Sequence, residues 1–124
     1  MNCPKCRAVM ERIAYEGIEI DRCTGCKGIW FDATEHEKLR EMEGAEAIDV
    51  GDPQVGELFN REEGINCPVC KVRMIPMVDK DQTHIWYEGC TVCYGVFFDA
   101  GEFKDFKFHT LMDVIRGLRA RERK

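Results

Sequence analysis

Apolar and polar residues alternate in a short stretch near the start of the chain. Ile13 and Tyr15, and after them Ile18 and Ile20, are separated by smaller or polar residues on either side of a Glu-Gly dipeptide. Alternation with a period of two, interrupted by a turn-forming pair, is typical of a β-hairpin. The pattern therefore predicts a hairpin over residues 7–22.

A second hairpin is predicted later in the chain. Its arms cover about residues 72–78 and 83–87, and residues 79–82 form a polar turn between them.

Each hairpin is followed by a segment whose apolar residues have the spacing of an α-helix. In residues 33–43, Leu39 and Met42 fall on one side of a helix, and a glycine follows at its end.

The longest periodic segment is residues 99–124, which predict an amphipathic helix with a basic end. Apolar residues recur there at the i, i+3, i+4 and i+7 spacing of one helix face. Such a face must pack against something, so we expect this helix to bind another protein or a second copy of the chain. The residues proposed for this contact are Leu111, Ile115 and Leu118 on the apolar face and Arg116, Arg119, Arg121 and Arg123 on the basic end.

The two hairpin-helix patterns belong to an internal repeat. Residues 23–35 read CTGCKGIWFDATE, and residues 90–102 read CTVCYGVFFDAGE. The repeat divides the chain into a first unit (1–43), a linker (44–65) with some apolar residues, a second unit (66–106) and the C-terminal helix. In both copies an Asp followed three residues later by Glu resembles a capping box, so a helix is expected to begin at each aspartate.

All eight cysteines lie in C-x2-C pairs at corresponding places in the repeat. A hairpin returns the chain to its starting point, so it brings the two pairs of each copy together. The sequence thus predicts two zinc sites, one per repeat, with the ligand sets Cys3, Cys6, Cys23 and Cys26, and Cys67, Cys70, Cys90 and Cys93. Each repeat is also short enough to need such a metal staple.

Two alternatives to zinc binding exist for these cysteines. Four disulfides would suit a secreted domain, but the chain begins MNCPKC, without the features of a signal peptide, and every pair has metal-ligand spacing. Four thiolates also suit iron, and the sequence does not separate iron from zinc.

Composition narrows the range of partners. The chain has 124 residues, with 18 Lys+Arg against 23 Asp+Glu and a formal charge of -5. A chain with a negative net charge is not attracted to nucleic acid by its overall charge. We therefore expect a protein as the binding partner, and nucleic acid is the less favoured alternative. No apolar run is long enough to span a membrane, and we expect a cytoplasmic protein.

The signature CPxC, hairpin, CxxCxGxWFDxxE resembles the transcription factor IIB-type zinc-finger family. The resemblance covers about residues 3–42 and 67–106. It implies two tandem zinc ribbons, a small metal-stabilised α+β fold, and the eight cysteines as zinc ligands. Phe97 stands where the family usually has tryptophan, and Thr34 where it commonly has glycine; both departures concern packing.

Four thiolates close a tetrahedral site and leave no position for a reacting water, so zinc here is expected to have a structural role. No nucleophile elbow, phosphate loop or HExxH motif is present. His36, His84 and His109 do not have ligand spacing from the cysteines and are expected to be ordinary surface or helix residues. The first hypothesis is a noncatalytic adaptor that binds protein, and the alternative is a redox-responsive thiol switch or chaperone-like protein.

Overall fold

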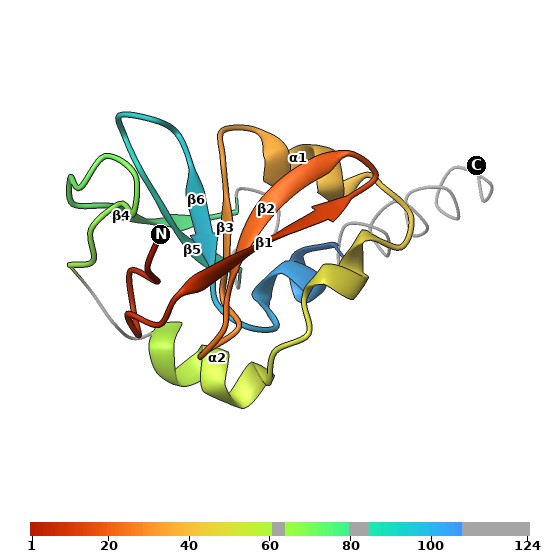
Figure 1. The fold of residues 1–124 in the computed structure, drawn as a ribbon, viewed down its shortest axis with the longest axis horizontal. Helices are drawn as coiled ribbons and strands as arrows, with labels where there is room; N and C mark the ends of the chain where they lie inside the picture. Colours follow the sequence, from red (N-terminus) through yellow and green to blue (C-terminus); the bar gives the residue numbers. More distant parts are fainter. Residues whose placement is uncertain (61–63, 80–84, 108–124) are drawn as a thin grey trace, which may run out of the picture.

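The computed structural model describes residues 1–60, 64–79 and 85–107. Two hairpins and several short helices make up this part of the chain (Figure 1). The elements are β1 (Met10–Tyr15), β2 (Ile18–Cys23), β3 (Ile29–Phe31), α1 (Glu35–Arg40), η1 (Ala45–Ile48, a 3₁₀ helix), α2 (Pro53–Asn60), β4 (Ile75–Val78), β5 (Trp86–Gly89) and β6 (Val96–Phe98). Residues 102–107 are also helical. The predicted α+β fold with two ribbons is confirmed.

The two repeats share one antiparallel sheet. Its strand order is β1-β2-β3-β6-β5-β4, and the third strands of the two repeats pair with each other at the centre. Trp30 lies opposite Phe97 in this central pair. The sequence pattern did not predict these two strands, since each has only three residues. The ribbons are therefore joined through backbone hydrogen bonds as well as through the linker.

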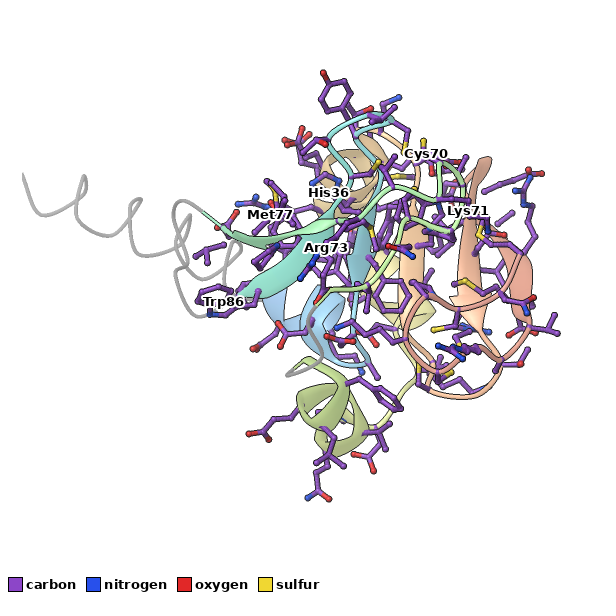
Figure 2. All side chains as sticks on the ribbon, turned by 90° about the vertical axis from the view of Figure 1, so that its left-hand side faces the viewer. His36, Cys70, Lys71, Arg73, Met77 and Trp86 are labelled. Atoms are coloured by element: carbon purple, nitrogen blue, oxygen red, sulfur yellow. The ribbon has the colours of Figure 1, made fainter. Side chains whose placement is uncertain are left out.

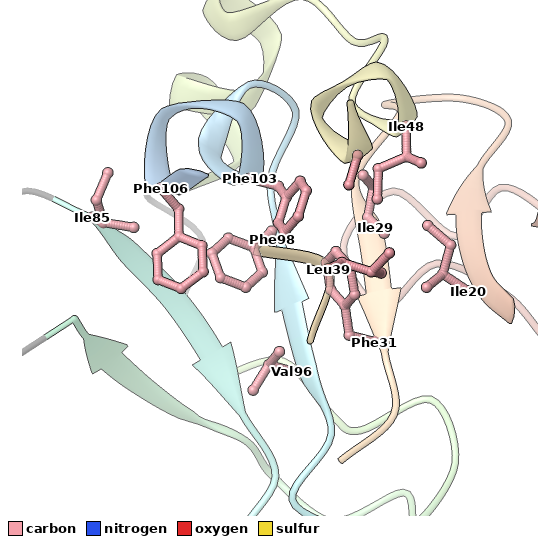
Figure 3. Packing of buried hydrophobic residues seen from close by; sticks show 11 residues of the cluster. Ile20, Ile29, Phe31, Leu39, Ile48, Ile85, Val96, Phe98, Phe103 and Phe106 are labelled. Carbon is pink, nitrogen blue, oxygen red and sulfur yellow. The ribbon is translucent and has the colours of Figure 1, made fainter. Parts of the chain in front are cut away.

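Each face of the sheet carries its own apolar cluster. On one face, Phe31, Phe98 and Phe103 are fully buried, and Leu39 and Ile48 from the segment after β3 pack with them (Figure 3). On the other face, the cysteines gather with buried residues that include Trp30, Phe97, Met10 and Met74. Because the side chains of a strand alternate between faces, Trp30 and Phe31 serve different clusters.

The helices tie the repeats together across the first face. The His36 ring of α1 lies 6.0 Å from the rings of both Tyr87 and Phe98 in the second repeat. In the opposite direction, the Phe103 ring lies 5.0 Å from the ring of Phe31 in the first repeat. His36 was expected to be an ordinary surface or helix residue; it lies in α1 and is buried there, and burial lowers its pKa. His84 and His109 lie outside the described residues.

The segment predicted as a linker contains η1 and α2. Directly after η1 lies Asp49, whose carboxylate accepts hydrogen bonds from the backbone N–H groups of Gly101 and Lys104, both at 2.9 Å. Asp49 thus caps the helical residues 102–107, a role that the sequence pattern does not indicate. A residue of the connecting segment holds the start of the second repeat's helix.

The helices begin later than predicted. α1 starts at Glu35, preceded by Thr34 in a left-handed conformation (φ 69°). Only half of the expected capping box is present, because the Glu35 carboxylate accepts the N–H of Asp32 while the Asp32 side chain binds Trp30 Nε1 instead. The second helix likewise begins at residue 102 and not at Asp99. Most of the predicted C-terminal helix lies outside the described residues.

Gly28 and Gly95 mark the close approach of the two repeats. A Cβ atom on Gly28 would lie 2.3 Å from the Phe97 ring, and one on Gly95 would lie 2.2 Å from the Trp30 ring. Each glycine therefore leaves room for an aromatic ring of the other repeat. Close approach of a ring explains both glycines, and neither has a positive φ.

We predict that Gly95→Ala destabilises the zinc-loaded protein by about 1–3 kcal/mol, because an extra methyl group forces the buried Trp30 ring to move. Urea unfolding followed by tryptophan fluorescence measures the change. Val92→Ala, an exposed position in the same turn, is the control and should change stability by less than about 0.5 kcal/mol. Equal stabilities for the two variants would show that the ring does not need this space.

Candidate metal centres

The first centre is built at one end of the first hairpin. Cys3 and Cys6 lie in the turn before β1, Cys23 ends β2, and Cys26 follows in the next turn. The hairpin register places Met10 opposite Cys23, which brings the two turns together. The four sulfur atoms lie within 4.8 Å of one another. The predicted ligand set of the first repeat is therefore assembled as expected.

The second centre repeats this arrangement in the second repeat. Cys67 and Cys70 precede β4, while Cys90 and Cys93 lie between β5 and β6. Their sulfur atoms also lie within 4.8 Å of one another. In the described part of the chain, these two cysteine groups are the clusters that could hold a metal ion through three or more ligands.

The sulfur positions suit tetrahedral zinc. Zn–S bonds of about 2.3 Å in a regular tetrahedron place neighbouring sulfurs about 3.8 Å apart. The Sγ atoms of Cys3 and Cys26 lie 3.7 Å apart, and those of Cys67 and Cys93 lie 3.8 Å apart. The Cys6–Cys23 distance is shorter, at 3.2 Å. Each centre fits one Zn²⁺, and all four of its positions are taken by thiolates.

Backbone geometry at each cysteine pair supports the thiolate form. The residue after the second cysteine of every pair has a positive φ: Arg7 (68°), Lys27 (65°), Lys71 (66°) and Tyr94 (62°). Backbone N–H groups in these turns point at sulfur, for example Cys70 N–H to the Sγ of Cys67 at 3.2 Å. Donors aimed at a sulfur favour its charged form.

The hydrogen bonds to sulfur lower the pKa of the Cys3 thiol. Its pKa is lowered to about 5, chiefly by a hydrogen bond from the Cys26 side chain, with further help from backbone N–H groups and against the effect of burial. Cys3 is thus held ready to be a thiolate ligand.

A buried lysine lies between the two cysteines of the first pair. The Lys5 side chain is fully buried, and its Nζ lies 2.8 Å from Asp99, 2.8 Å from Glu88 and 2.9 Å from the carbonyl oxygen of Phe59. Both carboxylates belong to the second repeat, so Lys5 connects the first metal centre to the sheet of the other ribbon. Burial raises the pKa of Glu88 to about 7, while the Lys5 charge lowers it.

The surroundings of the two centres differ in polarity. At the second centre, Val69, Val92 and Tyr94 are exposed by 51%, 60% and 71%. The corresponding residues of the first centre are Lys5, Gly25 and Lys27. The second pair of turns therefore presents an apolar surface that the first pair lacks. The basic and apolar residues proposed for partner binding at 111–123 lie outside the described residues.

Comparison with known proteins gives one family. The model of a family described as transcription factor zinc-finger matches residues 2–42 and 66–107, one segment per repeat. No curated protein and no solved structure matches the chain significantly. Within the described residues, no helix has the length and apolar character that crossing a membrane requires.

Proposed function

Because the chain belongs to the transcription factor zinc-finger family, with one zinc ribbon in each repeat, we propose that it is a noncatalytic adaptor that binds another protein. Both zinc ions have a structural role in this proposal, since four thiolates leave no place for a substrate or an activated water. Nucleic acid is a second possible ligand and is less favoured, because the formal charge is -5.

The apolar surface around the second centre carries the proposal. Val69 and Val92 are large apolar side chains on rigid, metal-stapled turns, and more than half of each is exposed. Exposed apolar residues that lie together on a rigid scaffold are typical of protein-binding sites. We propose that the apolar and basic residues in 111–123, which lie outside the described residues, also contact the partner. We place the protein in the cytoplasm, where reduced thiols persist.

The test compares partner capture by two forms of the zinc-loaded protein. The double variant Val69→Ser and Val92→Ser removes apolar surface without touching a ligand, and it should lose the proteins that the unmodified chain retains from its native cell extract. The control variant Thr24→Ser lies at the first centre and should retain them. Identical capture by all three forms, or binding of RNA or DNA alone at low salt, would contradict the proposal.

A redox switch is the second candidate, and the partial exposure of three ligands favours it. Cys6, Cys70 and Cys93 are only half-buried, so an oxidant can reach them more readily than the other thiolates. In this function, oxidation would release zinc and expose aromatic residues that are buried in the zinc-loaded protein, such as Trp30 and Phe97. Mild peroxide treatment followed by a zinc-release assay separates the two candidates, because an adaptor with purely structural zinc keeps its metal.

A further inference from the structure

The two metal centres differ in how well their ligands are shielded from solvent. In the first centre three thiolates are buried, and Cys6 is the half-buried one. In the second centre Cys67 and Cys90 are buried, whereas Cys70 and Cys93 are both half-buried. The sulfur atoms of each centre lie within 4.8 Å of one another. The second centre therefore presents a pair of neighbouring thiolates to solvent, and the first presents a single one.

Packing between the turns explains why the first centre is better covered. A Cβ atom on Gly25 would lie 2.9 Å from the Cβ of Ala8 and 3.3 Å from the Sγ of Cys6, so the two turns close tightly over this thiolate. In the second repeat, Val92 and Val72 take the places of Gly25 and Ala8, and they are exposed by 60% and 38%. Two valine side chains need more room, so the second pair of turns does not close in the same way.

Contacts between the repeats protect the first centre further. Lys5, which lies between its first two ligands, is held by two carboxylates of the second repeat and by the carbonyl oxygen of Phe59. In the second centre, Cys70 lies next to Lys71 in the turn that precedes β4 (Figure 2). This turn is held by local bonds, such as the one from the Lys71 ammonium to the carbonyl oxygen of Pro68 at 3.0 Å. It can therefore move without breaking the contacts that Lys5 makes.

Two accessible thiolates that lie close together can be oxidised to a disulfide by a peroxide. One thiolate attacks a peroxide oxygen; an S–O bond forms, the O–O bond breaks, and hydroxide leaves. The second thiolate attacks the sulfenic sulfur; an S–S bond forms, the S–O bond breaks, and a second hydroxide leaves. Both hydroxides take protons from solvent and become water. Two electrons pass from the sulfur pair to the peroxide, and the centre keeps two thiolates for its zinc ion.

We infer that the second centre is the one at which a peroxide acts first, through a disulfide between Cys70 and Cys93. The four thiolates of the first centre are still reduced when this bond forms, because Cys6 has only buried thiolates as neighbours. Zinc is therefore lost from the second centre before the first. This inference rests on the redox switch, the second candidate function, and identifies the centre at which the switch responds.

Cysteine mapping of the full-length, zinc-loaded protein tests the order of oxidation. The protein is treated with hydrogen peroxide, and samples taken at increasing times are denatured with a chelator and an alkylating reagent. Mass spectrometry of the peptides then identifies the oxidation state of each cysteine. The earliest samples should contain the Cys70–Cys93 disulfide, with all four cysteines of the first centre alkylated. A disulfide within the first centre, or oxidation of Cys6 at the same rate as Cys70, would overturn the inference.

Two variants at equivalent positions of the repeat test which thiolates control zinc release. Cys93→His and Cys26→His each keep four zinc ligands, because histidine coordinates zinc but forms no disulfide. Cys93→His should slow the initial release by about tenfold or more, since it removes one member of the accessible pair. Cys26→His, the matched control, keeps that pair and should release zinc at the initial rate of the unmodified protein. Equal rates for the two variants would contradict the inference.

Native mass spectrometry checks that each variant carries two zinc ions before peroxide is added, and the cysteine mapping of the unmodified protein needs neither variant. Retention of both zinc ions under peroxide would overturn the redox switch together with this inference. Release of zinc that begins at the first centre would overturn the inference alone. The partner-capture experiment on Val69 and Val92 tests the adaptor function separately.

Discussion

Replacement of Cys67 by serine is expected to unfold both ribbons, although the mutation alters only the second metal centre. Cys67 is fully buried and supplies one of four thiolates. Zinc binding contributes on the order of 10–16 kcal/mol in zinc-finger peptides near pH 7, about as much as or more than the 5–15 kcal/mol by which small domains are stable. Loss of this centre should therefore unfold the second ribbon.

The first ribbon should follow because it shares its central strand pair with the second. β3 has β6 as a neighbour, and the Trp30 ring fills the space over Gly95. Without β6, the buried side chains of β3 lose their cover. Native mass spectrometry should show that the variant lacks both zinc ions, and hydrogen exchange should show loss of protection in β1 and β2.

The control for this prediction is Thr91→Ser, which changes an exposed residue between two ligands of the same centre. It should keep two zinc ions and normal protection. A Cys67→Ser variant that retains one zinc ion and protected amides in β1 and β2 would show that the ribbons fold independently.

Replacement of Lys5 by methionine is expected to cost about 3–5 kcal/mol, as found when one partner of a buried ion pair is removed. Methionine fills a similar volume but leaves the carboxylates of Asp99 and Glu88 without the cation that they contact at 2.8 Å. It also removes the hydrogen bond to the carbonyl oxygen of Phe59. Urea unfolding of the zinc-loaded variant measures the loss.

Two further variants identify the cause of this loss. Lys38→Met, at an exposed position of α1, should change stability by less than about 0.5 kcal/mol. Loss of Lys5 raises the pKa of Glu88 above about 7, so adding Glu88→Gln to Lys5→Met should recover part of the stability at alkaline pH, where it removes a buried charge that has lost its partner. If Lys5→Met behaves like Lys38→Met, the buried ion pairs do not hold the ribbons together.

The metal centres could be predicted from the sequence because their geometry is local. Two cysteines three residues apart turn toward one ion, and a hairpin returns the chain to that ion. The spacing therefore identifies all eight ligands, and the repeat supplies a second, independent instance. The hairpins themselves were predicted for the same reason, from alternation over a few residues.

The union of the two ribbons could not be predicted in this way, because it depends on contacts between distant residues. The third strand of each ribbon has only three residues. Its two large aromatic residues are equally compatible with a loop that packs over the hairpin and with a strand. From the sequence alone, Lys5 is predicted to be a solvent-exposed residue between two ligands. Its burial could not be predicted, because both of its carboxylate partners lie in the other repeat. Asp49 is predicted to be a linker residue, because the helix that it caps begins 53 residues later in the sequence.

The zinc content of the folded protein tests the central claim most directly. Native mass spectrometry of the protein purified without added metal measures the number and identity of bound ions on each 14.3 kDa chain. The structure predicts two zinc ions on every folded chain, one for each set of four cysteines. Bound iron, a disulfide in place of a metal centre, or a folded chain with fewer than two zinc ions would contradict it.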